Sequence, residues 1–516
     1  MIMASNSPFA PKLGTNYVPE TDTELAEIYG YVAKDVAALT VLQREMSELQ
    51  TKLDALQSRC HSLQASIDAH RALASAFRRV PEDILREVFA FCMPDEPFAL
   101  IDAKQAPLLL THICAEWRQL AHSMPALWSA VHIHGPSATS IPPSTAAFPP
   151  EVVLDWLEHV RHSTMPVDLS VVFPCNIPDF WVPVMHRLRR LQLILEPGAG
   201  RQVDIQPFID ATAAELPQLS YLKLQSDRDR GPQFWPNASI LSLPTLRTVA
   251  LRIRADPLRL PLPWAELTSL KLICNFTATS IAAVFVGGLS VSDALDILGR
   301  CTNLRSADLR ITRGSQFQQR PAVTMAALEE LAISHGIFLP QFLNQIVAPR
   351  LRKLMLEPKA GREDEDKTLL LRALEPHAPN LIAVDFIATL FSTDTLIAFF
   401  PLAPALRELI LRHTGPGRPP ALVDHTALEQ LTHLQCPLLE RVEFVSCAAF
   451  NEWEFGAFLK ARTPTLRTVV IDFDRPRLFD VLQRLPPEKA ARLHLDLKYT
   501  DAYIATYNPR ARLDDL

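Results

Sequence analysis

The stretch Leu188-Arg-Arg-Leu191-Gln-Leu193 places three leucines in the order Leu-x-x-Leu-x-Leu, and Leu219-Ser-Tyr-Leu222-Lys-Leu224 repeats this order. A Pro-x-Leu tripeptide opens seven copies of the pattern. Repetition every 20 to 50 residues or so is typical of chains that stack one small unit on the next. Further copies begin 21 to 37 residues apart, at Leu246, Leu267, Leu304, Leu328, Leu351, Leu381, Leu406, Leu439, Leu466 and, in a weaker form, Leu493.

The segments between the copies complete the repeating unit. Runs such as 292–301 and 394–400 have helical spacing, so each unit is expected to hold a strand, a connector and a helix. This order resembles the leucine-rich repeat, which implies a right-handed α/β solenoid over residues 131–516, with one parallel sheet and outer helices. The alternative is a doubly wound α/β domain, but its open sheet would seldom exceed about ten strands. The spacing is uneven, and no regular Asn or Cys follows the last leucine.

Ahead of the repeats, residues 80–128 carry two short apolar patterns with helical spacing. The first begins at Pro81, which suits the first turn of a helix, and ends at Pro94. The second includes Ile113 and Trp117 and ends at Pro125. Two short helices bury little surface, so this many large apolar groups indicates either a binding face or the first two helices of a larger helical domain.

These residues resemble the F-box in the form found in mushroom-forming fungi. The family order is Leu-Pro, Cys-Leu-Pro, Val-Cys-x-x-Trp-Arg-x-Leu-Ala and Pro-x-Leu-Trp, and the chain follows it over about one tenth of its length. The departures Val80, Met93 and Ile113 all stay apolar. The resemblance implies an F-box over residues 79–130 that binds a Skp-type adaptor. The residues implied are Val80, Pro81, Ile84, Leu85, Val88, Phe89, Leu108, Ile113, Cys114, Trp117, Leu120, Pro125, Leu127 and Trp128.

Residues 25–70 carry an unbroken heptad pattern. Twelve of the fourteen a and d positions are apolar, which predicts a coiled-coil helix over residues 23–78. The partner of this seam is either a second copy, where leucines at d suit a parallel homodimer, or the chain's own repeat region. The a residues are Leu25, Val32, Leu39, Met46, Leu53, Cys60 and Ile67, and the d residues are Ile28, Asp35, Leu42, Leu49, Leu56, Leu63 and His70.

The composition of the chain limits its functional class. The 516 residues carry a net charge of −6 and no Lys/Arg run, which argues against nucleic-acid binding. The sequence shows neither an apolar run of about eighteen residues nor a secretory signal, so we expect no membrane span. Eight cysteines without a Cys-x-x-Cys pair indicate reduced thiols and a cytoplasmic or nuclear protein. Residues 1–22 are expected to form a disordered tail.

Motifs of catalysis are missing from the sequence. Walker, Gly-x-Ser-x-Gly and His-Glu-x-x-His motifs do not occur, so we expect no enzymatic activity and no cofactor. His132 and His134 share a strand face that suits a metal ion, but no Cys or acidic partner stands nearby in the sequence, and we expect no metal site. The acidic run 361–367 is expected to be a solvated loop.

The F-box resemblance implies the substrate-recognition subunit of a Skp-cullin-F-box ubiquitin ligase. Its solenoid would hold a protein substrate near the transferring enzyme and so raise the effective concentration of that substrate. Two alternatives remain: a non-catalytic coiled-coil and repeat scaffold, in which the short helices only cap the solenoid, and an enzyme within the solenoid.

The side chains between the repeat leucines are expected to face the partner from the inner strand face or from one edge of the sheet. Many of them are basic, which suits an acidic or phosphorylated partner, although the same charges also keep an exposed sheet soluble. The residues assigned to substrate binding are Arg247, Lys271, Arg305, Arg352 and Arg407.

Overall fold

The chain divides into two compact units, Met1–Val88 and Phe89–Leu516, and each is described by itself. The boundary falls within helix α2 (Glu82–Phe91). The computed structural model describes residues 7–74, 76–94, 97–134, 150–161, 163–173, 181–195, 205–226, 230, 233–274, 277–278, 285–286, 288–313, 320–358, 366–413, 421–433, 435–473, 481 and 492–499.

The first unit is dominated by one long helix, α1 (Asp22–Leu73). Its 52 residues give a length of roughly 78 Å at 1.5 Å per residue. The residues just before it lie against its first turns: Lys12 Nζ is 2.6 Å from Glu24 Oε1, and the ring of Phe9 meets Tyr31 edge-on. The polar composition of the predicted tail, residues 1–22, gave no sign of these contacts, and residues 1–6 lie outside the described part of the chain.

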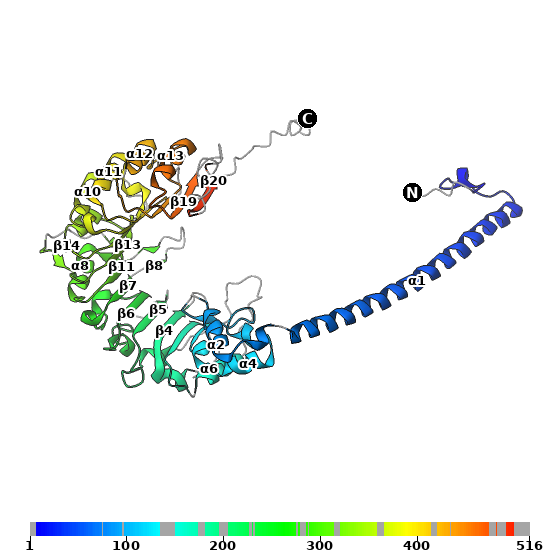
Figure 1. Ribbon diagram of the computed structural model, residues 1–516, viewed down its shortest axis with the longest axis horizontal. Helices are drawn as coiled ribbons and strands as arrows, with labels where there is room; N and C mark the ends of the chain where they lie inside the picture. The colour runs from blue at the N-terminus through cyan, green and yellow to red at the C-terminus, as the bar shows by residue number, and fades with distance from the viewer. Residues whose placement is uncertain are drawn as a thin grey trace. The chain divides into compact units, whose positions relative to one another are not determined.

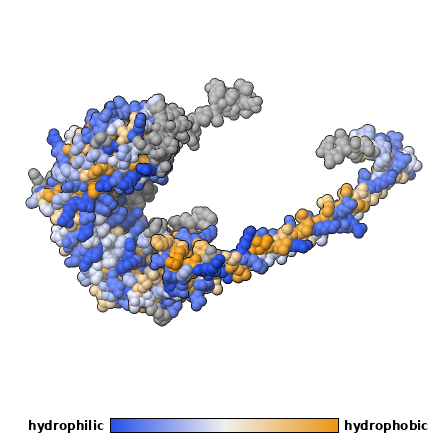
Figure 2. Space-filling model, viewed as in Figure 1, coloured by the Kyte–Doolittle hydropathy of each residue, from blue (hydrophilic) through white to orange (hydrophobic). Residues whose placement is uncertain are grey.

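The heptad positions of α1 face solvent. Apart from Ile28, which is half-buried, the large apolar residues of the seam are each at least 41% exposed, and Figure 2 shows hydrophobic residues in orange along this helix. The exposed members are Leu25, Val32, Leu39, Leu42, Met46, Leu49, Leu53, Leu56, Leu63 and Ile67.

The second unit is built on one sheet. Among the described residues the sheet has 16 strands, and every pairing in it is parallel. Strand follows strand along a curve, from β1 at one end to β20 at the other (Figure 1). Fifteen strands form the path β1 (Ala99–Leu100), β2 (Ala130–His134), β3 (Val167–Phe173), β4 (Leu188–Leu195), β5 (Tyr221–Ser226), β6 (Thr248–Ile253), β7 (Ser269–Cys274), β11 (Ser306–Arg313), β13 (Glu330–Gly336), β15 (Lys353–Pro358), β16 (Ala383–Ile387), β17 (Glu408–Arg412), β18 (Arg441–Val445), β19 (Thr468–Phe473) and β20 (His494–Tyr499).

The repeat leucines build the core of this unit. Alternate strand residues point to opposite faces of a sheet, so the last two leucines of Leu-x-x-Leu-x-Leu turn to the same side. Leu222, Val249 and Leu270 are register partners on adjacent strands, and all three are buried. Every copy of the repeat that the sequence predicts coincides with one of the strands β4 to β20, so the prediction of a parallel-sheet solenoid is confirmed.

The outer side of the solenoid carries the helices (Figure 1). From β3 to β7 the connectors are mostly short 3-10 turns with the single-turn α7 (Gln206–Ile209), whereas later connectors hold longer helices. Capping boxes at Ser290, Ser392 and Asn451 begin three of these helices. The later helices are α8 (Val291–Arg300), α9 (Leu339–Leu343), α10 (Lys367–Leu374), α11 (Thr393–Phe399), α12 (His425–Thr432) and α13 (Glu452–Arg462).

Short helices cover the β1 end of the sheet. These are α3 (Leu108–Thr111), α4 (Ala115–His122) and α5 (Pro125–Trp128), followed by α6 (Pro150–Arg161). The indoles of Trp128 and Trp156 meet edge-on with centroids 4.9 Å apart, and Trp156 Nε1 donates a hydrogen bond to the carbonyl oxygen of Trp128. The part of the F-box-like segment that belongs to the second unit is therefore continuous with the core of the solenoid.

Candidate functional site

The residues assigned to adaptor binding differ widely in exposure. Leu85, Phe89, Leu120, Leu127 and Trp128 are buried. Val80, Val88, Leu108, Trp117 and Pro125 are half-buried, and Pro81, Ile84, Ile113 and Cys114 are exposed.

The buried members of this set have clear structural roles. Within the second unit, the ring of Phe89 packs against Trp117 with centroids 4.9 Å apart. Trp128 Nε1 donates a hydrogen bond to the Ala121 carbonyl oxygen at 2.9 Å. The exposed Cys114 also has a local role, because its sulfur accepts a hydrogen bond from the Trp117 backbone N–H and caps α4. These side chains stabilise the helices, so a partner would contact other residues.

Exposed apolar side chains remain in the same segment. In the second unit Phe91 is 87% exposed, Ile113 is 53% exposed and Leu109 is 43% exposed; Ile84, in the first unit, is 50% exposed. Figure 2 shows an orange area over this part of the chain. The predicted adaptor-binding set omits Phe91 and Leu109, although Leu109 begins the second apolar pattern and Phe91 lies in the segment of the first. The exposed apolar groups of the second unit make this segment a candidate protein-binding surface.

Four of the five residues assigned to substrate binding lie at one edge of the sheet. Each of them belongs to an edge row, in which the backbone N–H of each residue donates to the carbonyl oxygen of the one before it. Every second member is an arginine. The edge row runs Arg189, Ser220, Arg247, Thr268, Arg305, Glu329, Arg352, Ile382, Arg407, Glu440, Arg467.

Several of these cations already have acidic neighbours. Arg247 lies 3.3 Å from Glu266, and Arg407 and Arg467 both approach Glu440, at 2.6 and 3.9 Å. These ion pairs reduce the positive charge that the edge row offers to an acidic partner. The predicted acidic or phosphorylated partner stays a prediction.

The fifth residue, Lys271, lies on the inner face of the sheet in a central row of register partners. The charge in this row changes sign along the solenoid: Lys223 and Lys271 come first, and four carboxylates follow from β11 onward. The central row runs Ser170, Gln192, Lys223, Ala250, Lys271, Asp308, Ala332, Met355, Asp385, Ile410, Glu443, Val470, Asp496.

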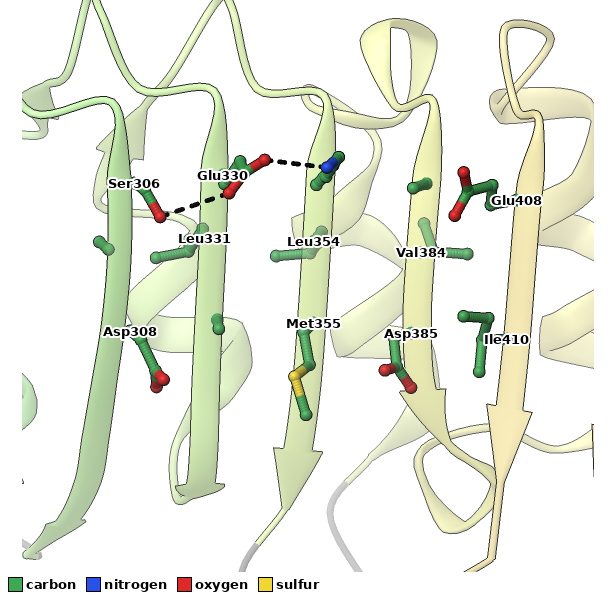
Figure 3. A pocket seen from close by; sticks show the side chains of 14 residues that line it. Ser306, Asp308, Glu330, Leu331, Leu354, Met355, Val384, Asp385, Glu408 and Ile410 are labelled. Atoms are coloured by element: carbon green, nitrogen blue, oxygen red, sulfur yellow. Dashed lines mark hydrogen bonds and ion pairs between the residues drawn. The ribbon is translucent and has the colours of Figure 1, made fainter. Parts of the chain in front are cut away.

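A groove of about 340 Å³ lies on the acidic part of this face, across β11 to β17 (Figure 3). Ala332 and Ala383 are small, and Met355 and Ile410 give the floor an apolar surface. The rim carries the carboxylates of Asp308, Glu330, Asp385 and Glu408 and the ammonium group of Lys353.

The groove carboxylates differ in their surroundings. Glu330 accepts a hydrogen bond from Ser306 at 3.4 Å and pairs with Lys353 at 3.0 Å, which raises the pKa of the Lys353 ammonium (Figure 3). Burial raises the pKa of the Asp385 carboxyl, although its ion pair with Arg412 acts in the opposite direction. The sequence carries these acids at the same x positions of the repeat as the basic residues. The sequence prediction considered only the basic residues at these positions and therefore did not identify the acidic ones.

Of the two histidines considered for a metal ion, His132 places its Nδ1 2.8 Å from the Ser170 hydroxyl oxygen on the next strand, and the His134 side chain lies outside the described residues. In the part of the chain that the structure describes, no group of three or more His, Cys, Asp and Glu side chains is arranged to hold a metal. Most of the acidic run 361–367 lies outside the described residues. The same described residues include no helix that combines the length and the apolar surface needed to span a bilayer.

Comparison with known proteins adds little to the geometry. No protein-family model matches the chain, and no curated protein matches it. Among solved structures, the chain is similar to the crystal structure of a TLR13–ssRNA13 complex, with 16% identity and a TM-score of 0.34. The match covers 65% of this chain and 46% of that one, so the chain spans less than half the length of that protein.

The fold class follows from the sheet itself, which has one parallel strand per repeat. The second unit is a leucine-rich-repeat-like solenoid. Within this solenoid, the groove on the acidic part of the inner face and the exposed apolar groups near Ile113 are the candidate protein-binding surfaces.

Proposed function

We propose that this chain is a non-catalytic receptor whose solenoid binds a protein partner in the groove on its inner face. The groove supports this role because it combines an apolar floor with four carboxylates. Of its lining residues in the described part of the chain Lys353 alone is cationic, and it pairs with Glu330, while Lys271 and Arg412 from outside the lining pair with Asp308 and Asp385. A partner segment with apolar and basic side chains fits this combination, because the apolar groups supply affinity and complementary charges supply specificity.

The central row also gives the partner an orientation. A basic segment fits over β11 to β18, where Asp308, Asp385 and Glu443 stand, and an acidic segment fits over Lys223 and Lys271. Reversing the partner would set like charges against each other, which disfavours the wrong orientation.

We further propose that the partner is a substrate for ubiquitin transfer and that residues 79–130 bind a Skp-type adaptor. The support is the sequence resemblance together with the exposed apolar groups at Phe91, Leu109 and Ile113. The scaffold alternative also has an observation in its favour, because β1 pairs with β2 and α5 packs on α6 at the end of the sheet. Capping uses the buried side chains and leaves the exposed ones available, so the two roles are compatible.

Affinity purification of the full chain from its source cells tests the groove. The bait carries Ile113→Asp, which we expect to disable adaptor binding and so to let substrate accumulate on the receptor. In this background Ala332→Trp fills the groove, and Ala250→Trp is the matched control, since it adds the same indole in the same row on β6. We expect Ala332→Trp to reduce recovery of the partner at least tenfold and Ala250→Trp to leave it unchanged. Equal recovery with both would contradict the groove.

A second pair of substitutions separates the groove from the edge row. Arg305→Ala with Arg352→Ala removes two edge arginines and leaves the groove intact. We expect partner recovery to persist with this pair. Loss of the partner here, with retention by Ala332→Trp, would instead favour the acidic partner that the sequence suggests.

A further inference from the structure

The heptad seam of α1 is largely exposed, and twelve of its fourteen a and d residues are apolar. It runs from Leu25 to His70, about 68 Å at 1.5 Å per residue, and water penalises its exposure. We propose that α1 joins two copies of this chain in an antiparallel coiled coil. This proposal is independent of the receptor function, and it rests on the charges in and beside the seam.

A parallel dimer in register would bring like charges together. Asp35 occupies a d position, so it would face Asp35 of the second copy across the seam. Two carboxylates held together in an apolar layer repel each other, and one would have to take up a proton. The e residue next to Asp35 is Val36, so no cation stands there to compensate.

An antiparallel dimer centred between Ser47 and Glu48 removes this conflict. In that alignment a positions meet d positions, and Asp35 faces Cys60 of the second copy. Arg59 of the second copy stands beside that layer, within reach of the Asp35 carboxylate. The full set of layers pairs Leu25 with His70, Ile28 with Ile67, Val32 with Leu63, Asp35 with Cys60, Leu39 with Leu56, Leu42 with Leu53 and Met46 with Leu49, each occurring twice.

The flanking positions agree with the same alignment. In antiparallel coils g faces g and e faces e, which sets Glu45 opposite Lys52 of the second copy twice. Gln43 and Gln50, both at e, face each other and can exchange amide hydrogen bonds. In a parallel dimer Glu45 would face Gln50, and Lys52 would face Gln57, so these charges would have no partners.

The alignment has a consequence for the assembly. The two C-terminal ends of the coil, where each chain continues toward its solenoid, would lie roughly 70 Å apart. A parallel coil would bring those ends together. The dimer would therefore separate the two points from which the chains continue toward their solenoids, which suits a partner with two copies of the recognised segment.

Thiol cross-linking of the purified full chain tests the arrangement. All variants carry Cys92→Ser, Cys114→Ser and Cys175→Ser, and the reagent is a short bismaleimide. With Cys60 as the seam thiol we expect no dimer cross-link, because two Cys60 residues of an antiparallel coil lie about 37 Å apart. Adding Asp35→Cys should give a cross-linked dimer, in which mass spectrometry finds the introduced thiol of one copy joined to Cys60 of the other. Asp35→Cys with Cys60→Ser is the control, and it should not cross-link.

Other results of this experiment would overturn the proposal. A Cys60–Cys60 link in the first variant, or a link between the two introduced thiols in the control, would show a parallel coil. Light scattering that gives the mass of one chain at micromolar concentration would exclude any dimer. A charge reversal gives an independent check: Glu45→Lys should weaken dimerisation about tenfold, and Glu45→Lys with Lys52→Glu should restore it. Failure of the double variant to restore dimerisation would contradict the alignment.

Discussion

Lys271 on β7 and Asp308 on β11 are register partners in the parallel sheet, with Nζ and Oδ2 2.5 Å apart. This pair stands where the central row changes from basic to acidic. On one side lies Lys223, and on the other lie the carboxylates that border the groove. The pair therefore marks the boundary between two parts of the inner face that attract opposite charges.

We predict that this pair affects binding more than stability. The Lys271 side chain is about half exposed, and an exposed ion pair contributes about 0 to 1 kcal/mol. A double-mutant cycle of Lys271→Met and Asp308→Asn, with the unfolding free energies measured by chemical denaturation, should give a coupling free energy below about 1 kcal/mol. A coupling above about 2 kcal/mol would mean that the pair is part of the structural core.

Trp128 should be essential for the stability of the second unit. Its indole is buried, contacts Trp156 and donates to the Ala121 carbonyl oxygen. We expect Trp128→Ala to lower the free energy of unfolding by about 4 kcal/mol, because such a substitution leaves a large cavity. Trp453→Ala is the matched control, since that indole is 61% exposed, and it should change stability little. Similar losses for the two variants in thermal unfolding would refute this role.

Arg462 at the end of α13 is a buried cation bonded to backbone. Its Nε donates a hydrogen bond to the Leu431 carbonyl oxygen at 2.6 Å. Its Nη1 and Nη2 donate to the carbonyl oxygens of Cys436 and Gln435. Burial lowers the pKa of this guanidinium. Arg462→Leu removes one donor from each of these three carbonyl groups, and only that of Cys436 keeps a second donor that the structure shows, the Leu439 N–H, so we expect a loss of about 3 kcal/mol in denaturant unfolding. Arg467→Leu, at a largely exposed arginine, should cost much less.

The stability of the chain should fall in mild acid. His122 and His159 stack with ring centroids 4.3 Å apart, and burial lowers the pKa of both imidazoles below the ordinary value of 6.5. The unfolded chain then takes up these protons at a higher pH than the folded chain, so stability decreases as the pH drops below about 6.5. Thermal unfolding from about pH 7.5 to about pH 5 should show this decrease. His159→Phe, which keeps a ring against Trp128, should reduce the slope, and an unchanged slope would exclude this cluster as a source.

The sequence predicts the sheet well because the repeat leucines are also its core. Leu222 and Leu270 are buried at the strand positions that the pattern gives them. The groove was not predictable in the same way, because it depends on the small residues Ala332 and Ala383 lying beside Met355 and Lys353 of β15, and the sequence does not state this register. The pairing of β1 with β2 was also missed, since Ala99–Leu100 is too short to give an alternating pattern.

The adaptor-binding residues show the same limit. The resemblance gave one set of positions for the F-box, and exposure divides that set into buried supports such as Phe89 and accessible groups such as Ile113. Periodicity identifies an apolar face of a helix, but it cannot say which part of that face the rest of the fold covers. Mutations meant to disrupt a partner and not the fold therefore belong at the exposed positions.

The most direct test of the receptor role is isothermal titration calorimetry, in which the purified full chain is titrated with a purified Skp-type adaptor from a mushroom-forming fungus. We predict saturable binding with one adaptor per chain, loss of binding with Ile113→Asp, and unchanged binding with Leu438→Asp, which alters a similarly exposed apolar residue elsewhere in the solenoid. An absence of binding by the folded native chain, or equal binding by both variants, would contradict the account.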